Sequence, residues 1–292
     1  MKKLFVFILS VMMILSMVAC GTSKTNVVAP TTEAPIETLE VTFAETSVVD
    51  NEECSIVITA IDPDNVFGYA LKVQLENKST DKTYVFNVDE ASINSVECTT
   101  LFATEVAPGK KANSEVILAV DDRTIAADIG EYTDIELTFC VYDSNNLTEP
   151  NVVEETVHVY PFGEDKATAF VRETLDTDNV ILDNEYVTVV VLGYEDNELW
   201  GYSVNLFLVN KTSTDVMFST SAVSVNDIML NPVYADSVAP GKCSFSYMTW
   251  FDSEFEENDI TEVNNIEFTL RAYNENDLTA VDFANEQIKL VP

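Results

Sequence analysis

The chain has 292 residues, which is enough for one large domain or two ordinary ones. Its 15 Lys and Arg oppose 50 Asp and Glu, a formal net charge of -35, so a phosphate backbone is repelled and nucleic-acid binding is excluded. A hydrophobic fraction of 47% is typical of a globular protein and not of a disordered acidic tail. With one His and no Gly-rich phosphate-binding motif, the sequence also excludes a multi-histidine metal site and shows no nucleotide-binding loop.

The N-terminus has the pattern of an export signal. Basic Lys2 and Lys3 precede an apolar run over 4–18 that is too short to span about 30 Å of hydrocarbon comfortably. The run ends in Ala19-Cys20-Gly21, which resembles the bacterial lipoprotein signal, in which the Cys receives a diacylglyceryl group. We therefore expect a signal peptide over 1–19, lipid attachment at Cys20 and stable anchoring by two acyl chains. A cleaved signal with an incidental Cys is the alternative.

Residues 20–37 are rich in Thr, Ser, Ala and Pro and have little apolar periodicity, so we interpret them as a tether. This places the protein at the outer face of a bacterial cytoplasmic membrane, in the extracellular space. The membrane is then a partner through the N-terminal lipid.

The rest of the chain is one module written twice. Gly68-Tyr69 recurs as Gly201-Tyr202 at an offset of 133, and Val106-Ala-Pro-Gly-Lys110 recurs as 238–242 at an offset of 132. Ile135-Glu136 recurs at an offset of 131. An offset that changes by single residues is typical of loop deletions in a duplicated domain. We predict a first module over 38–161, a connector over 162–177 and a second module over 178–292.

Inside each module the apolar residues recur with the period of two that is typical of strands with one buried face, as in Leu71, Val73 and Leu75. Only 124–132 and 253–261 favour a helical turn. About seven short strands per module predict an all-β chain of two tandem immunoglobulin-like antiparallel β-sandwiches. We expect the first strand over 38–44, while 164–177 is either linker or the first strand of the second module.

The lipoprotein signal, the tether and the tandem modules with their Gly-Tyr, Val-Ala-Pro-Gly-Lys and Ile-Glu-x-Thr motifs resemble surface lipoproteins of Gram-positive bacteria. The extracellular domains of those proteins are immunoglobulin-like. The resemblance implies attachment to the cell surface and implies no particular ligand.

The sequence offers few partners for catalysis. His158 has no counterpart in the second module, and no nucleophile elbow or Cys-His arrangement is present, so we predict that the protein is not an enzyme. A hydrolase that uses two carboxylates is the alternative, since fifty acids always allow some pair at the required spacing. Such a pair would need a cleft in which one carboxyl has a raised pKa.

Four cysteines follow Cys20, and each aligns with a different residue type in the other module. We therefore expect unpaired thiols, with a bridge between Cys54 and Cys140 as the alternative. The other two are Cys98 and Cys243.

The sequence predicts no cofactor. If the chain does bind one, calcium is the cofactor that the sequence supports best. Asp62 and Asp64 lie in one hairpin of the first module, and Glu195 and Asp196 lie in the equivalent hairpin of the second. They supply the oxygen ligands that calcium prefers, but the EF-hand pattern is not met, and solvated turns are the other interpretation.

These observations favour a non-catalytic, lipid-anchored surface protein that acts in adhesion or ligand binding, or as a spacer. A calcium- or glycan-binding module is the alternative. Trp200 and Trp250 could stack on a sugar ring, although burial in the core fits their apolar strands better. The sequence names no protein or glycan ligand. A concave pocket built from equivalent residues in both modules would favour ligand binding over spacing.

Overall fold

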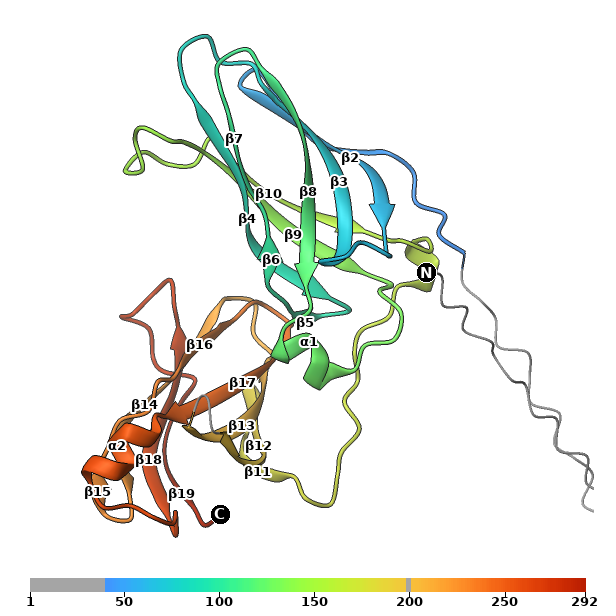
Figure 1. Cartoon of the computed structure of the whole chain (residues 1–292). Helices are drawn as coiled ribbons and strands as arrows, with labels where there is room; N and C mark the ends of the chain where they lie inside the picture. The colour runs from blue at the N-terminus through green and yellow to red at the C-terminus, as the bar shows by residue number, and fades with distance from the viewer. Residues whose placement is uncertain (1–39, 198–200) are drawn as a thin grey trace, which may run out of the picture. The chain divides into compact units, whose positions relative to one another are not determined.

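The computed structural model describes residues 40–197 and 201–292 (Figure 1). The predicted signal peptide, the lipid-attachment residue Cys20, the tether and Trp200 lie outside these ranges. The fold class is confirmed, because two antiparallel β-sandwiches account for nearly all of the regular structure. No helix among the described residues is long and apolar enough to cross a membrane.

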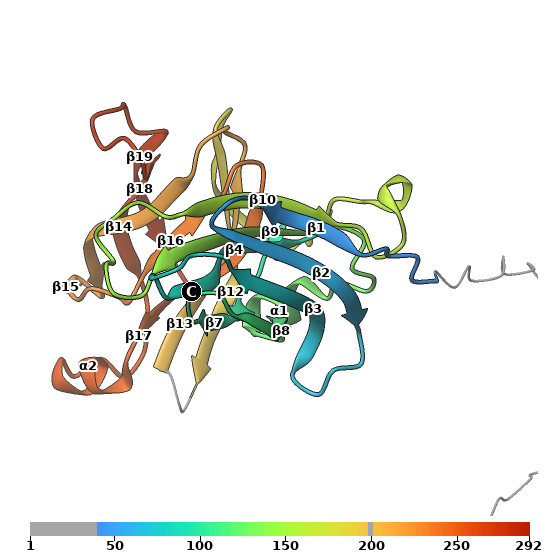
Figure 2. The same cartoon turned by 90° about the horizontal axis from the view of Figure 1, so that it is seen from above.

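The first sandwich has two layers, which Figures 1 and 2 show from two sides. One sheet has the order β1-β2-β3-β8-β6, and in the other β10, β9 and β4 are adjacent, with β7 and β5 on the free side of β4. The strands of the first sheet are β1 (Thr46–Asp50), β2 (Cys54–Asp62), β3 (Gly68–Asn77), β8 (Lys111–Ala119) and β6 (Thr100–Leu101). Those of the second sheet are β4 (Tyr84–Ile93), β5 (Val96–Glu97), β7 (Ala103–Val106), β9 (Ile135–Asp143) and β10 (Val153–Val159).

The second sandwich repeats this plan strand for strand, apart from β6. Its sheets are β11-β12-β13-β17 and β19-β18-β14, with β16 and β15 paired to β14. The strands of its first sheet are β11 (Asn179–Asp183), β12 (Val187–Asn197), β13 (Gly201–Asn210) and β17 (Cys243–Trp250). Those of its second sheet are β14 (Val216–Val225), β15 (Ile228–Met229), β16 (Ala235–Val238), β18 (Ile266–Asn274) and β19 (Ala284–Leu290).

The pairing is that of the immunoglobulin fold. In the first module β2, β3 and β8 are neighbours in one sheet, as strands A, B and E are in an immunoglobulin domain. In the other sheet β4, β9 and β10 follow one another as strands C, F and G do. The same correspondence holds in the second module, so the prediction of immunoglobulin-like sandwiches rests on the strand order itself.

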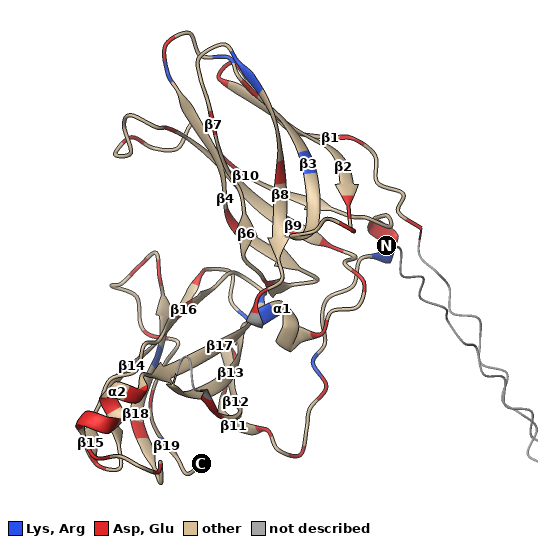
Figure 3. Cartoon of the chain, viewed as in Figure 1, with Lys and Arg blue, Asp and Glu red and all other residues tan. Residues whose placement is uncertain are grey.

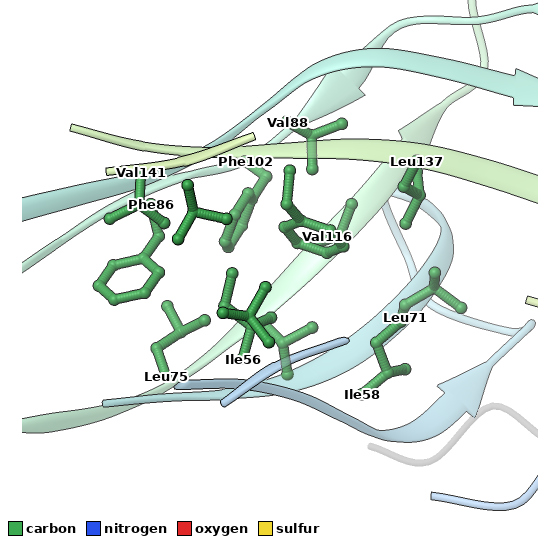
Figure 4. Packing of buried hydrophobic residues seen from close by; sticks show 14 of the residues in the cluster. Ile56, Ile58, Leu71, Leu75, Phe86, Val88, Phe102, Val116, Leu137 and Val141 are labelled. Carbon is green, nitrogen blue, oxygen red and sulfur yellow. The ribbon is translucent and has the colours of Figure 1, made fainter. Parts of the chain in front are cut away.

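Each sandwich has its own hydrophobic core, because the inward residues of both sheets alternate with outward ones. Figure 4 shows Ile56 and Leu75 from one sheet facing Phe86 and Val141 from the other. In the second module Trp250 is fully buried, and its indole N–H donates to the carbonyl of Leu230 at 3.0 Å. Burial of Trp250 in the core is as expected from its strand.

The repeated polar motifs serve the fold. Asn77 at the end of β3 donates to the carbonyls of Lys82 and Val106 at 2.8 Å each, which ties two loops together. Asn210 does the same in the second module through the carbonyls of Thr214 and Val238. The Pro-Gly pair of the repeated Val-Ala-Pro-Gly-Lys motif forms a tight turn in each module, where Gly109 and Gly241 have φ of 64° and 69°.

The prediction of a first strand over 38–44 was wrong. Residues 40–45 form no strand, and β1 begins at Thr46. The connector contains only a short 3₁₀-helix (Glu164–Lys166), so 164–177 is linker, and the second module starts its sheet with β11. Two short helices form, α1 (Asp122–Ala127) and α2 (Asp252–Glu257). Each begins one or two residues before the segment expected to form a helical turn and overlaps with it.

Candidate functional site

The same cleft occurs at the same end of both modules. It lies where the turn after β2 or β12, the end of β8 or β17 and the loop before β9 or β18 meet. The first cleft has a volume of about 360 Å³ and the second about 550 Å³. The first cleft is lined by Pro63, Asn65, Gly68, Tyr69, Val120, Ile129, Gly130, Glu131 and Tyr132. The second is lined by Asp196, Tyr202, Asp252, Phe255, Glu256, Ile260, Thr261, Glu262, Val263 and Pro292.

The lining positions correspond through the offsets of the repeat. Tyr69 matches Tyr202 at 133, and Val120 matches Asp252 at 132, in register with the paired strands. The loop over 129–132 matches 260–263 at 131. Equivalent residues of the two modules therefore line equivalent clefts, which is the observation that the sequence analysis required to favour ligand binding over spacing.

The repeated glycine makes room for one wall of each cleft. Gly68 has φ of 131°, and a Cβ there would lie 2.4 Å from the carbonyl oxygen of Leu118. Gly201 has φ of 87°, and its Cβ would lie 2.2 Å from the oxygen of Trp250. Only glycine allows this close approach, and the tyrosine that follows it in each module lines the cleft.

A repeated asparagine holds the opposite wall. The side-chain oxygen of Asn94 accepts from the backbone N–H groups of Thr133 and Asp134, and its amide donates to the carbonyl of Glu131. Asn226 forms the same contacts with the loop before β18, including a 2.7 Å bond to the carbonyl of Glu262. The motifs shared by the two modules therefore build the cleft as well as the sheets.

The first cleft is largely neutral and aromatic. The rings of Tyr69 and Tyr132 lie 5.0 Å apart, tilted by 38°. Burial, reinforced by Glu131 and Tyr132, raises the pKa of Tyr69 to about 12, so its hydroxyl remains a hydrogen-bond donor. That hydroxyl is buried and has no partner in the structure. The first cleft thus offers aromatic side chains, while the hydroxyl of Tyr69 is buried away from solvent.

The second cleft keeps the aromatic wall and adds charge. The ring of Tyr202 lies 5.8 Å from that of Phe255 and 6.4 Å from that of Trp250. Burial, then Tyr194 and Asp196, raises the pKa of Tyr202 to about 12. Acidic residues colour much of α2 red in Figure 3. The acidic residues that line this cleft are Asp196, Asp252, Glu256 and Glu262.

The residues proposed for calcium lie beside these clefts. Asp196 lines the second cleft, whereas Asp62 forms an ion pair with Lys72 at 3.1 Å on the other side of its hairpin. Asp64 and Glu195 are exposed. Within 40–197 and 201–292 no three acidic, His or Cys side chains are arranged to hold a metal ion. Calcium stays a prediction, which a comparison of melting temperatures in EDTA and in excess calcium would test.

The two modules contact each other through the outer face of the second module's first sheet. Phe207 and Phe245 pack at 5.0 Å between centroids, and Phe170 of the connector packs against both. Val96 and Ala127 of the first module complete this apolar cluster. The amide of Cys243 donates to the carbonyl of Ser95 at 3.0 Å, so β5 and β17 form a short parallel bridge.

A cavity of about 320 Å³ lies beside this contact and is lined by charged side chains from both modules. The carboxylate of Glu97 accepts from the backbone N–H of Ala239 at 2.6 Å, and Arg123 lies between Glu97 and Asp236 at 3.8 and 3.1 Å. Burial raises the pKa of Glu97 to about 8, and Asp236 and Glu90 add to the rise. This is the raised carboxyl pKa that the hydrolase alternative required.

His158 and the four described cysteines, which the sequence analysis also considered, have structural surroundings. His158 is half-exposed and lies 2.8 Å from Asp134 and 3.3 Å from Glu136, as expected for a surface residue. Glu136 also forms an ion pair with Lys242 of the second module. The four described cysteines are free and buried, so the alternative bridge between Cys54 and Cys140 is absent.

No protein-family model matches the chain, and no curated protein sequence matches it. Among solved structures, the complex of the CsuC chaperone with the CsuE tip adhesin from Acinetobacter baumannii has 10% identity and a TM-score of 0.23, covering 75% of this chain and 90% of that chain. The YadV chaperone also has 10% identity and a TM-score of 0.23, with 76% and 92% covered. Red sea bream transglutaminase has 11% identity and a TM-score of 0.25, covering 83% of this chain and 31% of its own. Likenesses this weak carry no inference about function.

Proposed function

We propose that this chain is a non-catalytic, lipid-anchored protein of the outer face of a bacterial cytoplasmic membrane, and that it binds ligand through a pair of equivalent clefts. The observation that carries the proposal is the repetition of the cleft at corresponding positions of both modules. A pure spacer needs no pocket, and clefts of about 300 to 1,000 Å³ with aromatic walls are typical of small-ligand sites. Cys20 supplies the anchor in this proposal.

The ligand half is tested by a thermal-shift screen of the full chain in neutral detergent, against sugars, amino acids, polyamines and short peptides. A ligand of the folded state raises the melting temperature by mass action. Replacing Tyr132 or Phe255 with Ala removes a partly exposed wall of one cleft, and each variant should lose the shift at its own cleft only. A library without hits, or hits that neither variant changes, would leave the spacer function.

The anchor half is tested by growing the expressing bacterium with an alkyne-tagged fatty acid. The wild-type chain should carry the tag and stay in the membrane fraction, whereas Cys20→Ser should lose both. Label retained by the Cys20→Ser variant would rule out lipidation at this residue.

A carboxylate hydrolase is the second candidate, and the raised pKa of Glu97 in the cavity between the modules favours it. Glu97 also has a structural role there, because it accepts the amide of Ala239 across the contact. Assay of Glu97→Gln against any polysaccharide that the wild-type chain cleaves would separate the roles. Loss of turnover with the melting temperature retained is the result expected of a catalytic acid.

A further inference from the structure

We propose that the contact between the two modules is a pH-controlled clasp, which is closed while the carboxyl group of Glu97 carries a proton and opens when that group loses it. The contact includes neither of the two clefts, so the inference does not depend on the proposed ligand-binding function. It follows from the geometry of the contact, from the charges around Glu97 and from the way in which the connector is held on both sides.

The modules can part without unfolding, because each sandwich has a hydrophobic core of its own. The contact is made by β5 and α1 of the first module with the start of β17 and the turn before it in the second. Its apolar part includes Phe207 and Phe245, and its backbone bond joins the amide of Cys243 to the carbonyl of Ser95. Opening would expose these two rings and leave both cores intact.

Glu97 lies at the point where the contact closes. It follows the residue of β5 that pairs with Cys243, and one of its carboxyl oxygens accepts from the backbone N–H of Ala239 at 2.6 Å. Its side chain is 15% exposed. In the second module Met229 takes the same place on the equivalent strand β15, and it is 66% exposed. The shared scaffold therefore does not require a buried carboxyl group at this position.

An ionised Glu97 would have to share its nearest cation. Arg123 of α1 lies 3.8 Å from Glu97 and closer, at 3.1 Å, to Asp236, whose side chain is 8% exposed. Lys242 also lines the cavity and forms an ion pair with Glu136. Carboxyl groups thus outnumber the cations here, and a proton on Glu97 avoids a buried charge without a partner of its own. The titratable and charged side chains that face Glu97 or line the same cavity are Asp89 and Glu90 of β4, Cys98, Arg123 of α1, Glu136 of β9, Asp236 of β16, Lys242 and Glu275.

The proton is held more tightly in the closed contact than in water. Burial raises the pKa of Glu97 to about 8, and Asp236 and Glu90 add to the rise, while the amide of Ala239 and Arg123 oppose it. When the modules part, the carboxyl group returns to water, where the pKa of a Glu side chain is about 4.3. Opening at neutral pH therefore releases a proton, and a rise in pH favours the open form.

The two pKa values set the pH range of the effect. Below about pH 4 Glu97 is protonated in both forms, and the closed form is favoured most. Between about pH 5 and about pH 8 the ratio of open to closed molecules should rise by up to about tenfold for each pH unit, because one proton is released. Above that range Glu97 is ionised in both forms, and its effect stays constant.

The connector provides a hinge for this motion. The amide of Phe170 donates to the carbonyl of Asn94 in the first module at 2.6 Å. Two residues later Arg172 is bound through both carboxylate oxygens of Asp178, which directly precedes β11. Val171, between these attachments, is 87% exposed. The chain can turn there while it stays bound to each module.

The test is hydrogen exchange of the full chain in neutral detergent from about pH 5 to about pH 9, with each rate corrected for that of an unprotected amide. The Cys243 amide reports opening even when the open form is rare. We expect its protection to fall by at least roughly tenfold in total up to about pH 8 and then to level off. Amides of the central strands β3 and β14 should stay more protected throughout. If the Cys243 amide exchanges only together with them, the modules part only by unfolding and the inference is wrong.

Variants identify the titrating group. Glu97→Gln keeps an oxygen for the amide of Ala239 and does not titrate, so the protection of the Cys243 amide should no longer depend on pH. Asp236→Asn removes a neighbouring negative charge and leaves Arg123 to Glu97, so the fall should be smaller than in the wild type. The control is Glu286→Gln, an exposed acid outside the contact, which should behave as the wild type does. A fall in Glu97→Gln as large as that of the wild type would overturn the inference.

Discussion

The outer faces of the equivalent sheets show how differently the two modules use one scaffold. On β3 and β8 of the first module this face carries Gln74 and Asn113, which are exposed. At the corresponding positions of β13 and β17 the second module carries Phe207 and Phe245, which are 9% and 3% exposed. The core behind both faces is the same in kind, so the difference lies in what each face contacts: solvent in the first module and the neighbouring module in the second.

The loops of the Val-Ala-Pro-Gly-Lys motif repeat this lesson. Lys110 of the first module is exposed, whereas Lys242 of the second is mostly buried and pairs with Glu136 across the contact. The turn is the same in both because Pro and Gly set its geometry. The side chain that the turn presents has acquired a partner in only one copy.

The largest expected effect comes from giving the second face the residues of the first. Phe207→Gln with Phe245→Asn removes two buried rings from the contact, and losses of about 3 to 5 kcal/mol are typical for each large aromatic removed from a packed site. We expect separate unfolding of the two modules in scanning calorimetry and fast hydrogen exchange at the Cys243 amide. Gln74→Ala with Asn113→Ala is the control and should change little. A variant that still unfolds in one transition would show that the contact does not depend on the rings.

A smaller loss of stability is expected from substitutions at the glycines that both modules share. Gly68→Ala should destabilise the first module by at least about 2 kcal/mol, because its Cβ would clash with the backbone of Leu118 in addition to the cost of positive φ. Gly109→Ala also has positive φ but meets nothing within 4 Å, so about 1 kcal/mol is expected. Urea denaturation measures both. Equal costs would contradict the role of Gly68 in the close approach beside the cleft.

The last expected effect is a change in the pH dependence of stability. The pKa of Glu97 is raised to about 8 in the folded chain, so the folded state retains a proton that the unfolded state loses near pH 4 to 5. Its contribution is complete below that range and is lost as the pH rises through about 8. Glu97→Gln, which does not titrate, should flatten the fall in melting temperature between about pH 5 and about pH 8. The exposed Glu105→Gln should leave the fall unchanged, and an unchanged profile in Glu97→Gln would place the titration elsewhere.

Much of the fold could be predicted because its signals are local or repeated. The alternation of apolar and polar residues located most strands. The repeated motifs, whose offset falls from 133 to 131 along the chain, aligned the two modules from the sequence alone. The first strand was misplaced because Thr38 to Ala44 is as rich in β-formers as Thr46 to Asp50, and only pairing with β2 selects the latter. Of the residues that line the clefts, the sequence predicts a binding role only for Asp196, and it shows Gly68-Tyr69 and Gly201-Tyr202 only as a repeated motif.

The sequence by itself determined the sandwich class and the duplication, since these depend on periodicity and repetition along the chain. Only the tertiary structure decided that Tyr202, Phe255 and Asp196 share a cleft and that Phe207 and Phe245 face another module instead of solvent. The physical reason is that a period of two says which residues share a face of a strand, while the identity of the neighbour on that face depends on groups far apart in the chain. Equivalent positions in a repeat share the same backbone conformation. Which side chain stands there depends on whether that face of the strand contacts solvent or another part of the protein.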